Sequence, residues 1–147
     1  MKSTISFKKY LWAAVIVWTM IIFAWSLQSG DDSSRVSGSL TEAVFGFLAR
    51  AGLEIDYESA HHFIRKTAHF TEYAVLGALV FNAQKKTPLL KSDALCICLW
   101  MIGVPAADET IQLFVPERAG MIADVLLDMS GFACAVLLCI LLKRKKN

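Results

Sequence analysis

The sequence has little charge for its length, and several common classes of protein are excluded by what it lacks. Only 19% of its 147 residues are charged, 56% are hydrophobic, the formal net charge is +2 and the mean hydropathy is +0.50. A chain this apolar lies outside the composition of an ordinary soluble domain. It contains no basic stripe with interleaved aromatic residues, so no nucleic-acid partner is expected. It has no internal repeat and no low-complexity tract.

Cysteine is also scarce. The chain has four: Cys96, Cys98, Cys134 and Cys139. Their spacings match neither a disulfide framework nor a zinc knuckle. All four fall in the inner halves of apolar stretches, so we interpret them as small residues of the helix core.

What the sequence does have is four long apolar windows. A helix needs roughly 20 residues to cross a hydrocarbon core about 30 Å thick. The windows are Tyr10–Leu27, Lys66–Gln84, Ala94–Val115 and Met121–Leu142. We therefore predict an all-α, multi-pass membrane bundle that forms one domain over residues 1–147. Its four transmembrane helices are expected at about 10–27, 66–84, 94–115 and 121–142.

Basic residues indicate the orientation of this bundle. They cluster before the first window, between the second and third, and after the fourth: Lys2, Lys8, Lys9, Lys85, Lys86, Lys91, Lys143, Arg144, Lys145 and Lys146. The positive-inside rule then predicts that both termini are cytoplasmic. A signal peptide is the alternative for the first window, because Ala24, Trp25 and Ser26 loosely fit a cleavage site. Its apolar run is longer than the usual signal core of about 7–15 residues.

The one sizeable extracytoplasmic segment runs from Gln28 to about Arg65. Apolar residues recur there at helical spacing: Val36, Leu40, Val44, Phe47, Leu48 and Ala51. This predicts an amphipathic helix over about residues 33–51, lying on the outer membrane surface or capping the bundle. Gly52 ends it, and Asp56–Ser59 is a start for the next helix, which is expected to continue to Gln84.

Strongly polar residues lie toward the outer end of the apolar stretches, in three runs. The first run is 65–73 and contains Lys66 and Tyr73. At 100° per residue, one narrow helical stripe carries His62, Arg65, His69, Glu72 and Leu76. A guanidinium, an imidazole and a carboxylate are therefore expected along one face.

The second run, 108–112, carries Asp108, Glu109 and Gln112. Pro105 precedes it by three residues and is expected to bend or locally open the helix.

The third run begins with Arg118 in a short turn. Asp124 and Asp128 follow one helical turn apart, and Gly131 continues their face and allows close helix contact. Supporting positions at the same level are Ser26, Gln28 and Pro116.

These side chains should face one another, because a charge near mid-bilayer costs about 2.5–3.5 kcal/mol on insertion scales. One interpretation is purely structural: Arg65, Lys66 and Arg118 neutralise the acids in an interhelical network. The acids are Glu72, Asp108, Glu109, Asp124 and Asp128. Five acids against three bases leave an excess of negative charge, which a proton, a cation or a cationic ligand would have to balance.

Three functional interpretations stand beside the structural one. A site for the headgroup of a membrane lipid or lipid-linked cell-wall precursor would use the bases against phosphate and the acids against hydroxyl or ammonium groups. A metal site would draw on His69 and the acids, but no second histidine lies on a neighbouring span, so neither a metal nor another cofactor is expected. A hydrolase or transferase would use a general acid or base, with Ser26 as the only candidate nucleophile. Its candidate catalytic residues are His69, Glu72, Glu109 and Asp128.

The order and spacing of the three runs resemble the VanZ-like membrane proteins over nearly the whole chain. The resemblance rests on Arg65, Lys66, His69, Glu72, Tyr73, Asp108, Glu109, Gln112, Pro116, Arg118, Asp124, Asp128 and Gly131. It implies a small multi-pass protein of the bacterial cytoplasmic membrane, in a family whose namesake is associated with low-level teicoplanin resistance. No established reaction comes with it. Ile111 stands where a histidine can precede the glutamine in the family, which further weakens a metal site.

Taken together, the sequence predicts an outward-facing polar pocket formed by the second, third and fourth spans and roofed by the amphipathic segment. Its ligand is expected to be an anionic envelope lipid or lipid-linked precursor, and its occupancy to modulate susceptibility to teicoplanin-type glycopeptides. The rivals are a membrane enzyme that acts on such a headgroup and a structural membrane subunit. The oligomeric state is left open.

Overall fold

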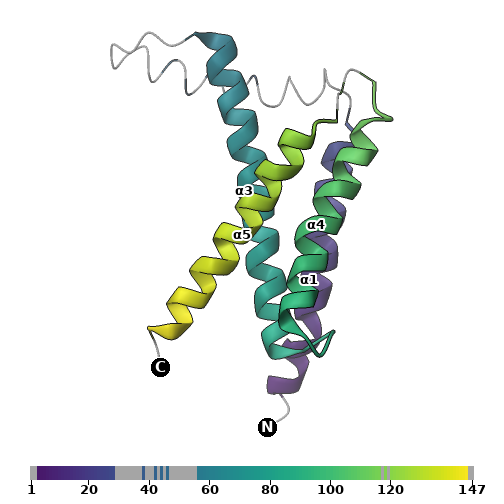
Figure 1. Cartoon of the computed structure of the whole chain (residues 1–147), viewed down its shortest axis with the longest axis vertical. Coiled ribbons are helices and arrows are strands. Elements are labelled where there is room, and N and C mark those ends of the chain that lie inside the picture. Colours follow the sequence, from purple (N-terminus) through teal and green to yellow (C-terminus); the bar gives the residue numbers. More distant parts are fainter. Residues whose placement is uncertain are drawn as a thin grey trace.

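A computed structural model describes residues 3–28, 38, 42, 44, 46, 56–116, 118 and 120–145, and over this part the chain is helical without strands. Its helices are α1 (Ser3–Ser26), α3 (Tyr57–Lys86), α4 (Asp93–Gln112) and α5 (Ile122–Arg144) (Figure 1). The predicted all-α class is confirmed over these residues. The amphipathic segment predicted at about 33–51 lies outside the described residues, except for a few single positions.

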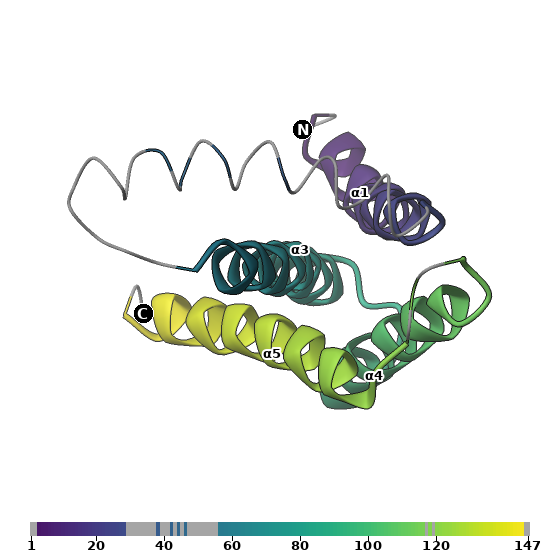
Figure 2. The same ribbon diagram turned by 90° about the horizontal axis from the view of Figure 1, so that it is seen from above.

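The helices run up and down, so the first residues of α1 and the last of α5 lie at one end of the bundle (Figure 1). We call this the terminal end; it also holds the turn between α3 and α4. The opposite end, with the last residues of α1 and the turn between α4 and α5, is the site end. Seen from above, α3 lies between α1 and α5 (Figure 2). The core between the helices includes Val15, Ile22, Tyr73, Leu76, Val80, Phe81 and Phe132.

Local sequence explains where the helices start. Asp56 is the N-cap of α3, and its carboxylate accepts a hydrogen bond from the Ser59 backbone N–H at 3.0 Å. This is the predicted start. Ser92 caps α4 in the same way. Helix α4 is continuous from Asp93 to Gln112 with Pro105 buried within it, so Pro105 does not end the helix, and the predicted bend or local opening there stays a prediction.

Two glycines set how closely α3 and α5 approach. A Cβ on Gly77 would meet the main chain of Phe132, and a Cβ on Gly131 would meet the carbonyl of Phe70. The predicted close contact at Gly131 is therefore confirmed. This contact also positions the site, since His69 adjoins Phe70 and Asp128 lies three residues before Gly131. The two polar residues face one another because the two backbones touch.

Many large apolar side chains are exposed on the outside of the bundle, and several polar side chains are buried between its helices. Exposed large apolar residues include Ile16, Val17, Met20, Leu99, Ile102, Leu126, Leu137, Leu138 and Leu141, whereas the buried polar ones are Ser26, Gln84, Asp108, Glu109, Gln112 and Asp128. Helices α4 and α5 are long and apolar enough to cross a membrane. Both observations are typical of a membrane protein.

The cysteines do not all lie in the core. Cys96 is buried and Cys139 half-buried, but Cys98 and Cys134 are exposed, and all four are free thiols. The prediction of core cysteines is therefore wrong for Cys98 and Cys134. Each lies on an outward helix face beside exposed leucines, where a small apolar side chain is equally well tolerated.

Candidate functional site

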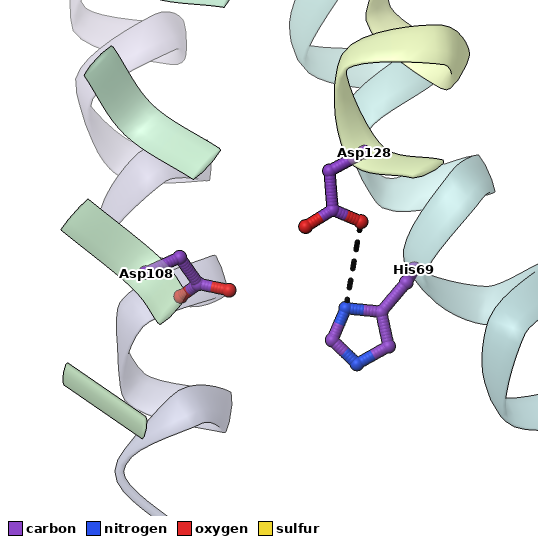
Figure 3. A group of neighbouring side chains, drawn as sticks. All are labelled: His69, Asp108 and Asp128. Carbon is purple, nitrogen blue, oxygen red and sulfur yellow. Dashed lines mark ion pairs between the residues drawn. The ribbon is translucent and has the colours of Figure 1, made fainter. Parts of the chain in front are cut away.

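The deepest polar group at the site end is formed by one residue from each of three helices: His69 of α3, Asp108 of α4 and Asp128 of α5 (Figure 3). One ligand atom from each lies within 4.8 Å of the other two. His69 Nδ1 is 3.7 Å from Asp128 Oδ1. Both aspartates are 0% exposed. Figure 3 shows the two carboxylates and the imidazole directed toward a common space. We call these three residues the central cluster.

The two aspartates of the central cluster have very different surroundings. Asp108 Oδ1 accepts a 2.5 Å hydrogen bond from the Ser26 hydroxyl, and its Oδ2 accepts one from Gln112 Nε2 at 3.3 Å. Gln112 Nε2 also lies 3.4 Å from Ser26 Oγ as a donor. In contrast, neither oxygen of Asp128 has a hydrogen-bond partner in the described part of the chain. Asp108 is thus held in place from α1 and α4, while Asp128 is oriented only by its helix.

Unpartnered polar atoms gather around the central cluster. Buried side-chain atoms without a hydrogen-bond partner among the described residues are His69 Nδ1, Tyr73 OH, Glu109 Oε1, Arg118 Nε and both carboxylate oxygens of Asp128. Tyr73 is 0% exposed and interacts electrostatically with Asp108 and Asp128. Buried polar atoms in folded proteins are nearly always satisfied, and exceptions call for a specific explanation. All six of these atoms lie at the site end.

A pocket of about 260 Å³ lies beside the central cluster. It is lined by His62, Arg65, Lys66, His69, Arg118, Met121, Asp124 and Leu127. We call it the cationic pocket because three bases converge on it. It opens between α3, the turn before α5 and α5 itself. No residue of α4 is among its lining residues, and α4 instead meets α3 and α5 in the central cluster, through Asp108.

The three bases of the cationic pocket form no direct ion pair with the buried acids among the described residues, although Arg118 interacts electrostatically with Asp108 and Glu109. In the described part of the chain, the ion pairs are His69–Asp128 and Lys85–Asp93, and neither involves Arg65, Lys66 or Arg118. Arg118 donates instead to the Trp25 carbonyl at 3.4 Å. Burial, and then the like charge of Arg65, lowers the pKa of Arg118. Within the described residues, the direct ion pairs of the purely structural network are therefore not formed.

Two other predicted site residues have different positions from those expected. Glu72 does not share the cationic pocket with His69: it lines an apolar cavity of about 740 Å³, with Trp18, Phe63 and Val75 among its neighbours. Glu109 Oε2 accepts a 2.8 Å hydrogen bond from the Met121 backbone N–H at the start of α5. It thus caps α5 from a different helix, where the chain offers no side-chain cap of its own.

The supporting positions are peripheral, with one exception. Pro116 is exposed in the turn after α4, and Gln28 is half-buried, with its backbone N–H donating to Trp25 at 3.2 Å. Ser26 is the exception, since it is 3% exposed and bonded to Asp108. It lines neither the cationic pocket nor the apolar cavity, and its hydroxyl already donates to Asp108. This argues against Ser26 as a nucleophile.

Sequence reasoning missed contacts that use the main chain. The Trp25 carbonyl accepts from Arg118, and the Met121 N–H is capped by Glu109. The first leaves no trace in the sequence. The second does leave one: no Ser, Thr, Asp or Asn precedes Ile122, so the start of α5 needs a cap from elsewhere.

Comparison with known proteins places the chain in a family. The model of the VanZ/LLP1 family matches residues 11–143, which include every member of the central cluster and the cationic pocket. Searches of curated proteins and of solved structures found no match. Because the matched range covers far more than half of the sequence, the chain belongs to the VanZ/LLP1 family.

Proposed function

We propose that this protein crosses the bacterial cytoplasmic membrane four times, with both termini in the cytoplasm and the site end facing outward. The basic residues Lys85, Lys91, Lys143 and Arg144 belong to the terminal end, where the turn between α3 and α4 meets the last residues of α5. The positive-inside rule favours a cytoplasmic location for that end. The central cluster and the cationic pocket then lie near the outer leaflet.

In this orientation, the function that the geometry supports best is binding of the phosphate-bearing headgroup of an envelope lipid or lipid-linked cell-wall precursor. The observation that carries it is the convergence of Arg65, Lys66 and Arg118 on one pocket without a carboxylate partner among the described residues. Three like charges repel one another in a half-buried place. A phosphate would relieve this repulsion and accept charge-assisted hydrogen bonds from the bases.

The size of the cationic pocket fits a headgroup and not a whole lipid. Its volume is about 260 Å³, just below the usual range for small-molecule sites of roughly 300–1,000 Å³. The acyl or polyprenyl chains would remain in the bilayer. The larger apolar cavity lies against the opposite face of α3, because the residues of this helix that line it alternate with those that line the cationic pocket. A headgroup in the cationic pocket would therefore not extend into the apolar cavity.

Asp124 and His69 add selectivity at the same pocket. A carboxylate among bases disfavours a bare anion but accepts hydrogen bonds from hydroxyl or ammonium groups, which adjoin the phosphate in glycerol, ethanolamine and sugar headgroups. The expected ligand therefore carries a phosphate next to a hydrogen-bond donor. Binding such a lipid at the outer leaflet would alter its exposure and thereby change how lipophilic glycopeptides of the teicoplanin type engage the cell surface.

Native mass spectrometry of protein extracted with its surrounding lipid tests this proposal. Arg118→Glu should abolish retention of the bound anionic lipid, because one contact to a charged group contributes about 1.5–3 kcal/mol, or roughly 10–100-fold in Kd, and the reversal adds repulsion. The matched control is Lys91→Glu, a charge reversal at an exposed position of the terminal end. Equal lipid retention in wild type and Arg118→Glu would contradict the proposal.

A further inference from the structure

We infer that the central cluster, His69, Asp108 and Asp128, is a binding site for a divalent transition-metal ion. Three donor atoms from three helices lie within 4.8 Å of one another. Two donors bound about 2.1 Å from one ion are roughly 3.0–4.2 Å apart. The 3.7 Å between His69 Nδ1 and Asp128 Oδ1 falls inside this range and is too long for a hydrogen bond. The spacing of His69 and Asp128 therefore suits an ion between these two side chains better than direct contact, with Asp108 close enough to be a third ligand.

Asp128 supplies an observation that is independent of the spacing. Its side chain is 0% exposed, and both its oxygens lack a hydrogen-bond partner among the residues that the structure describes. Figure 3 shows the carboxylate directed at the space shared with His69 and Asp108. An isolated, ionised carboxylate in a buried place is strongly disfavoured unless a proton or a counter-ion balances its charge. No Lys or Arg in the described part of the chain forms an ion pair with it. A divalent cation would balance both aspartates at once.

Asp108 has the surroundings expected of a ligand that is oriented in advance. Ligating carboxylates are usually held by hydrogen bonds from neighbouring residues. Ser26 of α1 and Gln112 of α4 provide such bonds, and each carboxylate oxygen of Asp108 keeps a second lone pair for an ion. The buried Tyr73 hydroxyl, also unpartnered, lies within electrostatic range of both aspartates and can donate to a ligand oxygen or to a metal-bound water.

The donor set selects the class of metal. Carboxylates alone favour Mg²⁺, Ca²⁺ or Mn²⁺, while an imidazole favours the transition metals. One imidazole with two carboxylates therefore fits Zn²⁺ or Mn²⁺. The sequence alone offers little reason to expect this site, because no histidine lies on the helices that neighbour α3. The fold compensates by bringing an aspartate from each of two further helices to that histidine.

The metal site does not depend on the proposed headgroup function, although the two adjoin. His69 belongs both to the central cluster and to the lining of the cationic pocket. An ion held by His69 would thus lie at the inner wall of this pocket, within reach of a bound phosphate. Metal binding is measured without lipid, and lipid retention is measured after chelation, so either proposal can fail alone.

The experiment uses the full chain in detergent, stripped with a chelator and titrated separately with Zn²⁺, Mn²⁺ and Mg²⁺. Binding is followed by elemental analysis and by native mass spectrometry. We expect one equivalent of Zn²⁺ or Mn²⁺ in the wild type and none in Asp128→Asn or His69→Gln. Ser26→Ala should weaken binding by about 10–100-fold, the usual effect of losing a group that orients a ligand.

Asp93→Asn is the matched control, because Asp93 begins the same helix that carries Asp108 but lies at the terminal end. It should keep full metal binding. A thermal melt separates loss of the site from loss of the fold: Asp128→Asn should unfold cooperatively, with a midpoint that Zn²⁺ and Mn²⁺ no longer raise. Absence of stoichiometric Zn²⁺ or Mn²⁺ in the wild type, or its retention in a folded Asp128→Asn variant, would overturn the inference.

Discussion

The two ends of the bundle treat buried polar groups in opposite ways. At the terminal end, Gln84 is 0% exposed, yet its whole amide is satisfied. Its Nε2 donates to the Leu90 carbonyl at 2.7 Å and to Asp93 Oδ1 at 2.9 Å, and its Oε1 accepts from the Leu89 N–H at 2.8 Å. One side chain thereby fixes the turn between α3 and α4. The Gln84 amide therefore has no free group to offer a ligand.

At the site end, several buried side-chain atoms have no hydrogen-bond partner among the described residues. The unpartnered atoms belong to His69, Tyr73, Glu109, Arg118 and Asp128, and they include both oxygens of the fully buried Asp128. Both ends have similar means of satisfying polar groups, including main-chain carbonyls and amide side chains. The difference indicates that polar residues of the terminal end serve the architecture, and those of the site end serve something that binds.

The largest expected effect on stability comes from removing the hydrogen bonds of Gln84 at the terminal end. Gln84→Leu keeps about the same volume but removes the hydrogen bonds of the Gln84 amide to Leu89, Leu90 and Asp93, so we expect a loss of about 1–3 kcal/mol in the free energy of unfolding. Thermal unfolding in detergent measures it. Asn82→Leu is the control, because the Asn82 amide donates only within α3, to the Ala78 carbonyl. Similar midpoints for the two variants would mean that Gln84 does not fix the turn.

At the site end, a substitution is expected to increase the free energy of unfolding, by a smaller amount. In metal-stripped protein, Asp128→Asn replaces a buried, unpartnered carboxylate by a neutral amide of the same shape, which should raise stability by about 1 kcal/mol. The same melt, with chelator present, measures it. Asp124→Asn is the control, since Asp124 is half-buried at the pocket rim and should change little. Destabilisation by Asp128→Asn under these conditions would show that the carboxylate has a structural partner.

The sequence predicts features that depend on one helix at a time. Asp56 is recognisable as an N-cap, because its side chain needs only the N–H three residues later. Gly131 is recognisable as a contact point, because a missing Cβ allows any neighbouring helix to approach. Helical periodicity likewise places His62, Arg65 and His69 on one face, and all three line the cationic pocket.

Features that depend on how helices rotate against one another are not predictable in this way. Helical spacing groups Glu72 with His69, but Glu72 lies at the edge of the stripe, and the packing of α3 between α1 and α5 directs it to the apolar cavity. Charge counting suggests pairing of Arg118 with the acids, whereas the turn before α5 brings it to the Trp25 carbonyl. Only the assembled helices reveal that Asp108 is partnered and Asp128 is not.

The smallest expected effect on stability concerns the ion pair at the terminal end, and it tests which interaction stabilises the turn between α3 and α4. Lys85 and Asp93 form an ion pair at 2.6 Å, but their side chains are 44% and 38% exposed. Water and salt screen such a pair, and ordering two flexible side chains offsets most of its attraction. Lys85→Ala should therefore leave the unfolding midpoint within the scatter of repeated melts, at low and at high salt.

The buried amide of Gln84 would then account for the stability of the turn, with Asp93 acting as its acceptor. A clear, salt-dependent loss in Lys85→Ala would instead assign that role to the ion pair, and satisfaction of buried groups would no longer distinguish the two ends.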